Sequence, residues 1–243
     1  MTSSLSKPAR VRDLAIPLAV AGLVIGGEYF FRHYVLFWLP TLGTLLVNDM
    51  LSLFLVYLLL TVGLSLSMHS SWRQEAAGVG QALREGLTRW DFTFWVLALA
   101  FSVWALSRLD QFLWGAVKLP MLVSSYRNPT IWLARFAPLL KVVSLLFVNG
   151  LFVPIAEEYL WRGLVQVRLV RILPAPLAVG LTALLFSLKH VLVDASLGRF
   201  LSLLDFGVIC GTVAQRHTWK RSAALHMIIN TAATLTGLLF GLN

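Results

Sequence analysis

The sequence predicts an all-α integral membrane protein, a polytopic bundle of about 7–8 transmembrane helices with interfacial amphipathic helices. Of its 243 residues, 58% are hydrophobic and 13% are charged, whereas about 25% of a typical soluble domain is charged. The mean hydropathy is +0.79, and the apolar residues gather in segments long enough to cross a bilayer. We therefore expect a single integral membrane domain over residues 1–243. The one cysteine, Cys210, excludes an intrachain disulfide.

Seven apolar segments are the predicted spans, and polar or basic connectors separate them. They cover residues 14–31, 50–68, 92–109, 138–161, 174–193, 200–214 and 223–242, of which the sixth is short. Residues 70–90 are polar enough to form an amphipathic helix at the interface, and residues 110–137 suit a surface loop with short helices. An eighth span hidden within 110–137 would invert the orientation of everything upstream. Residues 1–137 thus form N-terminal membrane helices, and residues 138–243 form a motif-bearing catalytic core.

The chain is basic, with a formal net charge of +9 and an isoelectric point of about 10.3. Because the basic residues lie between apolar spans, they indicate membrane orientation and not binding to nucleic acid. With seven crossings and the N-terminus in the cytoplasm, 12 of the 20 Lys and Arg residues are cytoplasmic, which is the expected sign. The basic N-terminus precedes an apolar run without a convincing cleavage site, so we expect an uncleaved first helix.

Two adjacent carboxylates mark the end of the fourth span, in the stretch P-I-A-E-E-Y-L-W-R from Pro154 to Arg162. A charge at the centre of a bilayer costs about 2.5–3.5 kcal/mol, so we expect Glu157 and Glu158 to have a function. Glu158 and Arg162 are four residues apart on one helix face and can form an ion pair. Glu157 has no neutralising partner on its own helix, which makes it a candidate general base or acid. Pro154 frees a backbone carbonyl one turn earlier and can bend the helix.

Two further motifs place histidines in later spans. F-S-L-K-H runs from Phe186 to His190 in the fifth span, and H-M-I-I-N runs from His226 to Asn230 in the seventh. The end residues of each motif are four apart, so three helices each present a polar patch that can face one interior. We hypothesise that Glu157 and His190 hold and deprotonate a water molecule. His226 and Asn230 would then donate hydrogen bonds to the oxyanion formed when this water attacks a carbonyl.

Structural roles are the alternative for each of these groups. Buried ion pairs are often structural, and a single histidine or asparagine in a span is more often an interhelical hydrogen-bonding partner than a catalyst. The coordinated placement of polar residues in three spans favours a shared site. For Glu28, Asp49 and Asp205, the other acids in or near the spans, we expect packing or topology roles, with Asp205 as a candidate support of the site.

The three motifs together resemble those of the CPBP family, which includes CAAX prenyl proteases and bacteriocin-processing or bacteriocin-immunity membrane proteins. E-E-Y-L-W-R matches the family motif E-E-x-x-x-R, F-S-L-K-H matches F-x-x-x-H, and H-M-I-I-N matches H-x-x-x-N. The resemblance covers about residues 138–243 and implies a glutamate-dependent intramembrane endopeptidase. The catalytic residues that it implies are Glu157, His190, His226 and Asn230, and the supporting residues are Glu158, Arg162 and Phe186. The family has also been described as metalloproteases, so a divalent metal such as zinc at Glu157, His190 and His226 stays open.

From this resemblance we expect hydrolysis of a peptide bond near the C-terminal tail of a membrane-associated or exported protein or peptide. The partners are then the substrate and the lipid bilayer, and the compact chain favours the inner membrane of a bacterium. Two alternatives use the same polar cavity without hydrolysis, a transporter and a bacteriocin-immunity-type binding protein. The sequence has no inverted repeat and no matched pair of broken helices, which argues against transport. It also lacks the motifs H-E-x-x-H, G-x-G-D and G-x-S-x-G of other intramembrane proteases.

Overall fold

Helices form the regular structure of the chain in a computed structural model that describes residues 11–35, 45–68, 72–115, 117 and 136–240. Their bounds are α1 Val11–Phe30 with a π-helical end at Phe31–Val35, α3 Leu45–Ser67, α4 Trp72–Leu87, α5 Trp90–Trp114, α6 Ala137–Ser144, α7 Val153–Glu158, α8 Val167–Leu169, α9 Ala175–Asp194, α10 Phe200–Arg216 and α11 Trp219–Phe240. Six helical segments in these described ranges are long and apolar enough to cross a membrane. The predicted polytopic helical bundle is therefore confirmed.

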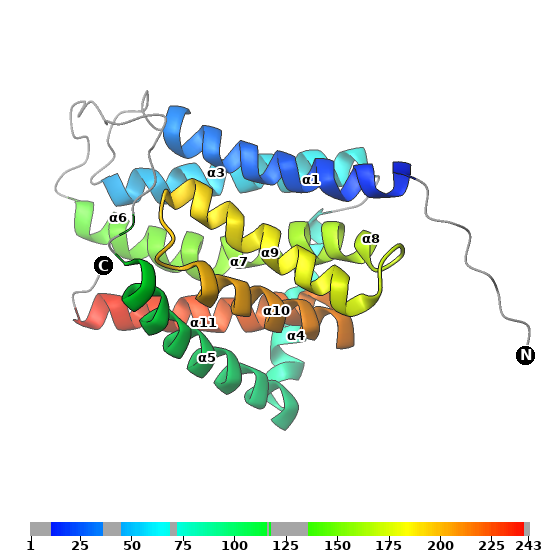
Figure 1. The fold of residues 1–243 in the computed structure, drawn as a ribbon. Helices are drawn as coiled ribbons and strands as arrows, with labels where there is room; N and C mark the ends of the chain where they lie inside the picture. The colour runs from blue at the N-terminus through cyan, green and yellow to red at the C-terminus, as the bar shows by residue number, and fades with distance from the viewer. Residues whose placement is uncertain (1–10, 36–44, 69–71, 116, 118–135, 241–243) are drawn as a thin grey trace, which may run out of the picture.

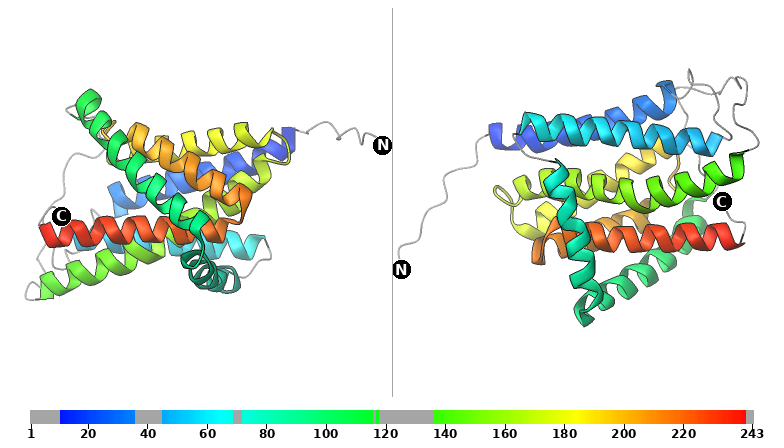
Figure 2. Two further views of the ribbon diagram at one scale, coloured as in Figure 1. Left: turned by 90° about the horizontal axis from the view of Figure 1, so that it is seen from below. Right: turned by 180° about the vertical axis from the view of Figure 1, so that it is seen from behind.

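Most of these helices lie side by side along one direction (Figure 1). α5 is strongly tilted against the others, and α4 runs across one end of the bundle, where it contacts α11 (Figure 2). The position of α4 agrees with the interfacial amphipathic helix predicted within residues 70–90. Successive long helices alternate in direction, so the start of α1, the α8–α9 turn and the α10–α11 turn all lie at the same end (Figure 1).

Six of the seven predicted spans coincide with the six long apolar helices. The short predicted span at 200–214 appears as α10, whose 17 residues are at the lower limit for a crossing and which packs against α9 and α5. α5 continues beyond its predicted end to Trp114, and residues 118–135 of the expected surface loop lie outside the described residues. The fourth helix ends at Leu169 and not at Trp161, because partners within the bundle satisfy the polar side chains that follow Trp161. Gln166, for example, donates a hydrogen bond of 2.8 Å to the carbonyl of Gly211.

The acidic motif lies in one continuous helix of 33 residues, Ala137–Leu169. Within this helix, α7 is flanked by π-helical segments at Leu145–Phe152 and Tyr159–Gln166. The π-helix is rare and occurs most often at functional sites, because its wider turns shift the register of the side chains that follow. Both glutamates of the motif therefore stand between two changes of helical register.

Pro154 explains how α11 docks against this helix. Because proline has no backbone N–H, it cannot satisfy the carbonyl groups one turn before it. Two side chains of α11 use these acceptors instead. Asn230 Nδ2 donates to the carbonyl of Asn149 at 3.1 Å, and Thr231 Oγ1 donates to the carbonyl of Gly150 at 3.3 Å. The predicted free carbonyl is thus a docking point for the helix that carries the third motif.

α10 is held closely against α9 and α5. A Cβ atom at Gly207 of α10 would lie 2.8 Å from both Cα and Cβ of Ala183 on α9, so only glycine allows this approach. The start of α10 is capped by Asp110 of α5, whose carboxylate accepts the backbone N–H groups of Leu201 at 2.9 Å and Ser202 at 2.8 Å. These contacts position α10 beside the helix that carries the second motif.

We expect the substitution Gly207→Ala to force α10 away from α9 and to lower the melting temperature of the purified protein in detergent. Overpacking of this kind costs about 1–3 kcal/mol, and each kcal/mol lowers the melting temperature of a chain of this size by about 2–4 °C. Gly180→Ala on α9 is the matched control, because nothing lies within 4 Å of its added Cβ. Equal melting temperatures for the two variants would contradict the proposed close packing.

Candidate active site

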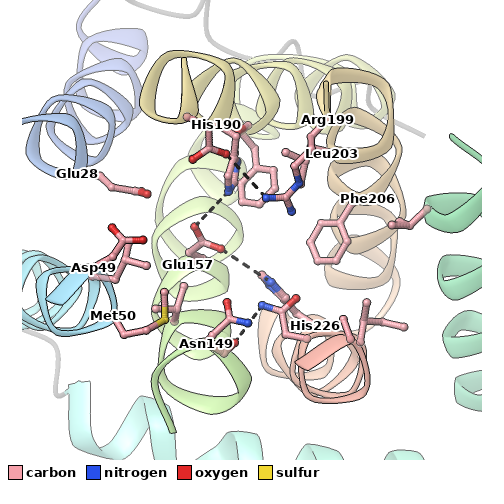
Figure 3. Close-up of a pocket in the computed structure, with 18 of the residues that line it drawn as sticks. Glu28, Asp49, Met50, Asn149, Glu157, His190, Arg199, Leu203, Phe206 and His226 are labelled. Carbon is pink, nitrogen blue, oxygen red and sulfur yellow. Dashed lines mark hydrogen bonds and ion pairs between the residues drawn. The ribbon is translucent and has the colours of Figure 1, made fainter. Parts of the chain in front are cut away.

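A cavity of about 310 Å³ lies within the bundle, and polar side chains from several helices converge on it (Figure 3). Glu28 comes from α1, Glu157 from α7, His190 from α9 and His226 from α11. Asn230 of α11 also lines this cavity. The structure thus brings together all four residues for which the motifs predict a catalytic role.

Glu157 lies at the meeting point of the three motifs, and only 4% of the residue is exposed. Its Oε1 is 4.0 Å from Nε2 of His190, and its Oε2 is 3.9 Å from Nε2 of His226. Both separations are too long for a direct hydrogen bond, but a single water molecule can contact the carboxylate and an imidazole at this spacing. The carboxylate and the two imidazoles therefore face one small space in the cavity (Figure 3).

Lys189 of α9 neutralises Glu157, which has no counter-ion on its own helix. Its Nζ lies 2.6 Å from Oε1 of Glu157 and 2.8 Å from Oε2 of Glu28. The Tyr57 hydroxyl is 2.7 Å from Oε1 of Glu157 and 2.6 Å from Oε2 of Glu28, and it can donate to one of them at a time. We call Glu28, Tyr57, Glu157 and Lys189 the buried charge cluster. The ammonium favours the ionised carboxylate, which is the form that a general base requires.

Three members of this cluster were missed by the sequence-based reasoning. For Glu28 we expected a packing or topology role, but Glu28 lines the cavity and binds Lys189. A signal was present, because Lys189 stands directly before His190 in an apolar span and a buried lysine needs a carboxylate partner. Glu28 is the acid of the first span, but helical spacing cannot pair residues from distant parts of the chain.

The Glu158 side chain points away from Glu157 and contacts a second set of polar side chains, which are Arg162, Ser222 and His226. The predicted ion pair is present, with Arg162 Nη1 3.0 Å from Oε1 of Glu158. Ser222 Oγ donates to Oε2 of Glu158 at 2.6 Å, and Nδ1 of His226 lies 3.1 Å from Oε1. The side chains of Glu158 and Arg162 are both 0% exposed. Glu158 therefore orients the His226 ring so that its Nε2 faces Glu157.

Phe186 contacts both Arg162, the partner of Glu158, and His190, which faces Glu157. The Arg162 guanidinium lies 4.8 Å from the centroid of its ring, and the His190 ring packs edge-on at 4.7 Å between centroids. The Nδ1 atom of His190 is 2.9 Å from the carbonyl oxygen of Phe186. Because a carbonyl can only accept, Nδ1 carries the proton, and Nε2 of the neutral imidazole is free to accept one.

A network of ion pairs lies at one end of the cavity. Arg32 Nε is 2.9 Å from Oδ1 of Asp49, and Arg32 Nη1 is 2.9 Å from Oδ1 of Asp194, so this network links α1, α3 and α9. Asp49, for which we expected a packing or topology role, forms this ion pair between helices and also lines the cavity. Asp205, the candidate support, is not among the residues lining the cavity; its carboxylate accepts a hydrogen bond of 2.6 Å from Ser102 and links α10 to α5.

The residues considered as zinc ligands do not fit a metal ion in this arrangement. In the part of the chain that the structure describes, no group of three or more His, Cys, Asp and Glu side chains is placed to hold a metal ion. Glu157, His190 and His226 share the cavity, but the ammonium of Lys189 already contacts Oε1 of Glu157 at 2.6 Å. This fixed positive charge repels a second cation from the carboxylate.

Comparison with known proteins identifies the region that carries the motifs. Residues 139–232 match the family model described as type II CAAX prenyl endopeptidase Rce1-like. The match covers all three motifs, from Glu157 to Asn230, and confirms the resemblance. No curated protein and no solved structure matches the chain. This membrane protein therefore carries, over residues 139–232, a match to the Rce1-like model of type II CAAX prenyl endopeptidases.

Proposed function

We propose that this protein is an intramembrane endopeptidase that cleaves near the C-terminal tail of a membrane-associated or exported protein or peptide. The single observation that supports this best is the arrangement around Glu157. Its carboxylate faces Nε2 of His190 and of His226 across gaps of 4.0 and 3.9 Å, inside a cavity enclosed by membrane-spanning helices. Hydrolysis within a membrane needs such a polar space, because lipid supplies neither water nor hydrogen-bond donors.

In this proposal a water molecule occupies the gap beside Glu157. Oε1 of Glu157 is bound by Lys189 and Tyr57, so Oε2 is the oxygen that is available to accept a proton from the water. Nε2 of His190 can accept a second hydrogen bond from the same water, because Nδ1 is directed to a carbonyl group. A positioned base of this kind accelerates proton transfer by about 100- to 10,000-fold.

His226 and Asn230 form the proposed oxyanion site. His226 lies between two carboxylates, with Nδ1 3.1 Å from Oε1 of Glu158 and Nε2 3.9 Å from Oε2 of Glu157, and in this proposal Nε2 is the donor to the oxyanion. The Asn230 amide has two hydrogens, and one of them binds the carbonyl of Asn149. The second hydrogen is available for an oxyanion.

The proposed reaction then balances without any further reactant. Glu157 takes a proton from water, and the oxygen of that water bonds to the scissile carbonyl carbon. The resulting oxyanion is stabilised by His226 and Asn230. The carbon–nitrogen bond breaks as the leaving amine takes the proton from Glu157, which leaves a new carboxyl group and a new amine and regenerates the carboxylate.

Lys189 is a positioning residue in this scheme. It keeps Glu157 ionised and binds Oε1, so that Oε2, which lies 3.9 Å from Nε2 of His226, stays available to the water. For the cellular location, the finer proposal is the inner membrane of a bacterium with the N-terminus in the cytoplasm. It rests on the excess of Lys and Arg in the segments assigned to the cytoplasm.

Replacing Glu157 by glutamine should abolish cleavage while the protein still folds. The variant keeps the shape of the side chain and removes the base, and we expect a loss of about 100- to 10,000-fold. The assay is mass spectrometry of a pool of peptides with free C-terminal carboxylates, incubated with purified protein in lipid vesicles. Glu85→Gln is the matched control, because Glu85 is exposed on α4.

Cleavage by Glu157→Gln at the rate of the unmodified protein would overturn the proposed hydrolysis. Binding of pool peptides without cleavage by either protein would favour an immunity-type binding protein. Uptake of a pool peptide into the vesicle lumen without cleavage would favour a transporter. Both alternatives use the same cavity and need no base.

Replacing Lys189 by methionine should lower cleavage at neutral pH and move the acidic limb of the pH–rate profile to higher pH. Without the ammonium, the ionised form of Glu157 is less favoured, so a higher pH is needed to keep the base unprotonated. The variant also removes the ammonium that Glu28 and Glu157 share and leaves Glu157 without a Lys or Arg partner, which costs about 3–5 kcal/mol of stability for a buried pair.

Two further variants separate the role of Lys189 in catalysis from its role in folding. Adding Glu28→Gln to Lys189→Met removes one of the two acids that lose the ammonium. This should restore part of the melting temperature without restoring the acidic limb of the pH–rate profile. Lys220→Met is the control. The Nζ atom of Lys220 lies 3.2 Å from Oε2 of Glu75, and neither residue lines the cavity. If Lys189→Met leaves the acidic limb of the pH–rate profile unchanged, then Lys189 has only a structural role.

Treatment with a chelator should leave cleavage unchanged, because Lys189 already supplies positive charge at Glu157. Metal analysis of the treated protein is needed alongside the activity measurement. Loss of cleavage on chelation that is restored by added zinc would contradict this expectation and would place a metal in the mechanism.

A further inference from the structure

Two arginines and no lysine line the cavity in the part of the chain that the structure describes, and only one of them is bound to acids. Arg32 donates from Nε and Nη2 to Asp49 at 2.9 and 3.2 Å, and from Nη1 to Asp194 at 2.9 Å. For Arg199, the nearest carboxylate oxygen among the described residues is Oδ2 of Asp194, which lies 3.8 Å from Nη1. That separation is too long for a hydrogen bond. The N–H donors of the Arg199 guanidinium therefore remain available to a ligand.

The acids that line the cavity do not depend on Arg199. Each of the four lies within 2.9 Å of another cation, because Lys189 binds two of them at 2.6 and 2.8 Å and Arg32 binds the other two at 2.9 Å. The four acids are Glu28, Asp49, Glu157 and Asp194. Removal of Arg199 would therefore leave none of these carboxylates without a partner.

The backbone that carries Arg199 is fixed by α5. Asp110 of α5 caps the start of α10 and accepts the backbone N–H of Ser202 at 2.8 Å. Ser202 Oγ in turn donates to the carbonyl of Arg199 at 3.1 Å, and Gln111 of α5 donates to the carbonyl of Gly198 at 3.1 Å. Figure 3 shows the Arg199 guanidinium pointing into the cavity from the side of α10. The side chain is 62% exposed, so a fixed backbone presents an accessible cation to the cavity.

The proposed substrate brings a negative charge into the same space. A peptide that is cleaved near its C-terminal end carries its terminal carboxylate a short distance beyond the scissile bond. The cavity has a volume of about 310 Å³, a size that encloses a drug-sized molecule, so a bond placed at Glu157 and the nearby terminus have to share it. A carboxylate that leaves water inside a membrane protein is costly unless a cation binds it.

We propose that the Arg199 guanidinium binds the C-terminal carboxylate of the peptide, so that the cavity selects tails that end in a free carboxylate. This subsite deepens the proposed endopeptidase function and rests on it for the identity of the ligand. The planar guanidinium can donate two parallel hydrogen bonds to the two oxygens of a carboxylate. Arg199 is thus a specificity-determining residue, and Glu157 remains the base.

A peptide with an amidated C-terminus is the natural comparison, because it keeps the sequence and removes the charge. Hydrogen bonds to a charged group contribute enough free energy to change affinity by about 10- to 100-fold. We therefore expect the free carboxylate form of a peptide to bind more tightly than its amide by this factor. The difference should disappear when Arg199 is replaced by glutamine.

A retention experiment tests the subsite without depending on catalysis. The probe is a mixed pool in which each peptide is present with a free C-terminal carboxylate and as the amide. Glu157→Gln protein in phosphatidylcholine vesicles is incubated with this pool, and the retained peptides are identified by mass spectrometry. We expect carboxylate forms to be enriched about 10- to 100-fold over their amides, and the double variant Glu157→Gln/Arg199→Gln to show no enrichment.

The matched control is Arg108→Gln in the same Glu157→Gln background. Arg108 is exposed on α5 and does not line the cavity, so the enrichment should persist. Equal retention of both forms by the Glu157→Gln protein would overturn the subsite and leave Arg199 as a solvated arginine. Retention of neither form, or enrichment that survives Arg199→Gln, would overturn it as well. Melting temperatures of all variants establish that they are folded.

Kinetics on a peptide that the unmodified protein cleaves separate binding from the chemical step. We expect Arg199→Gln to raise KM for the carboxylate form by about 10- to 100-fold with kcat kept, and to leave the amide form unaffected. An equal fall of kcat for both forms would overturn the subsite. Equal cleavage of carboxylate and amide by the unmodified protein would remove the subsite and leave the endopeptidase. Carboxylate enrichment without any cleavage would remove the endopeptidase and leave the subsite.

Discussion

The pairing of Lys189 with Glu157 is the interaction on which the site depends. An ion separated from water in a helical bundle is costly unless a partner of opposite charge and further hydrogen bonds compensate it. Here two acids and a tyrosine surround one ammonium, and Arg32 lies 3.7 Å from Glu28. Negative and positive charges therefore alternate from Glu157 through Lys189 and Glu28 to Arg32. The network keeps a carboxylate ionised in an apolar protein, and because it binds Oε1 of Glu157 it leaves Oε2 facing His226.

The two adjacent glutamates have different binding partners because of helix geometry. Neighbouring residues on a helix point in directions about 100° apart, so Glu157 and Glu158 enter different surroundings. Glu158 is bound by Arg162 and Ser222, whereas Glu157 is bound by Lys189 and Tyr57. The His226 imidazole contacts the Glu158 carboxylate directly and faces the Glu157 carboxylate across 3.9 Å, so it connects the two acids.

The N-terminal helices contribute to the site as well as to the membrane domain. The family match covers residues 139–232, but Glu28 of α1 and Tyr57 of α3 lie outside it and complete the buried charge cluster. Arg32 and Asp49, also outside the match, form an ion pair that lines the cavity. A catalytic core limited to the matched residues would therefore leave Lys189 and Glu157 with fewer partners.

The sequence alone determined the membrane class, six of the long helices and the three motifs, because hydropathy and the four-residue spacing of a helix are local properties. It also determined the ion pair of Glu158 and Arg162, whose partners are one turn apart. Only the tertiary structure decided that Lys189 turns into the cavity and meets Glu28 and Tyr57, because that contact depends on how α1, α3 and α9 pack together. The same holds for the convergence of Glu157, His190 and His226 on one cavity, since the packing of side chains between helices leaves no periodic pattern in the chain.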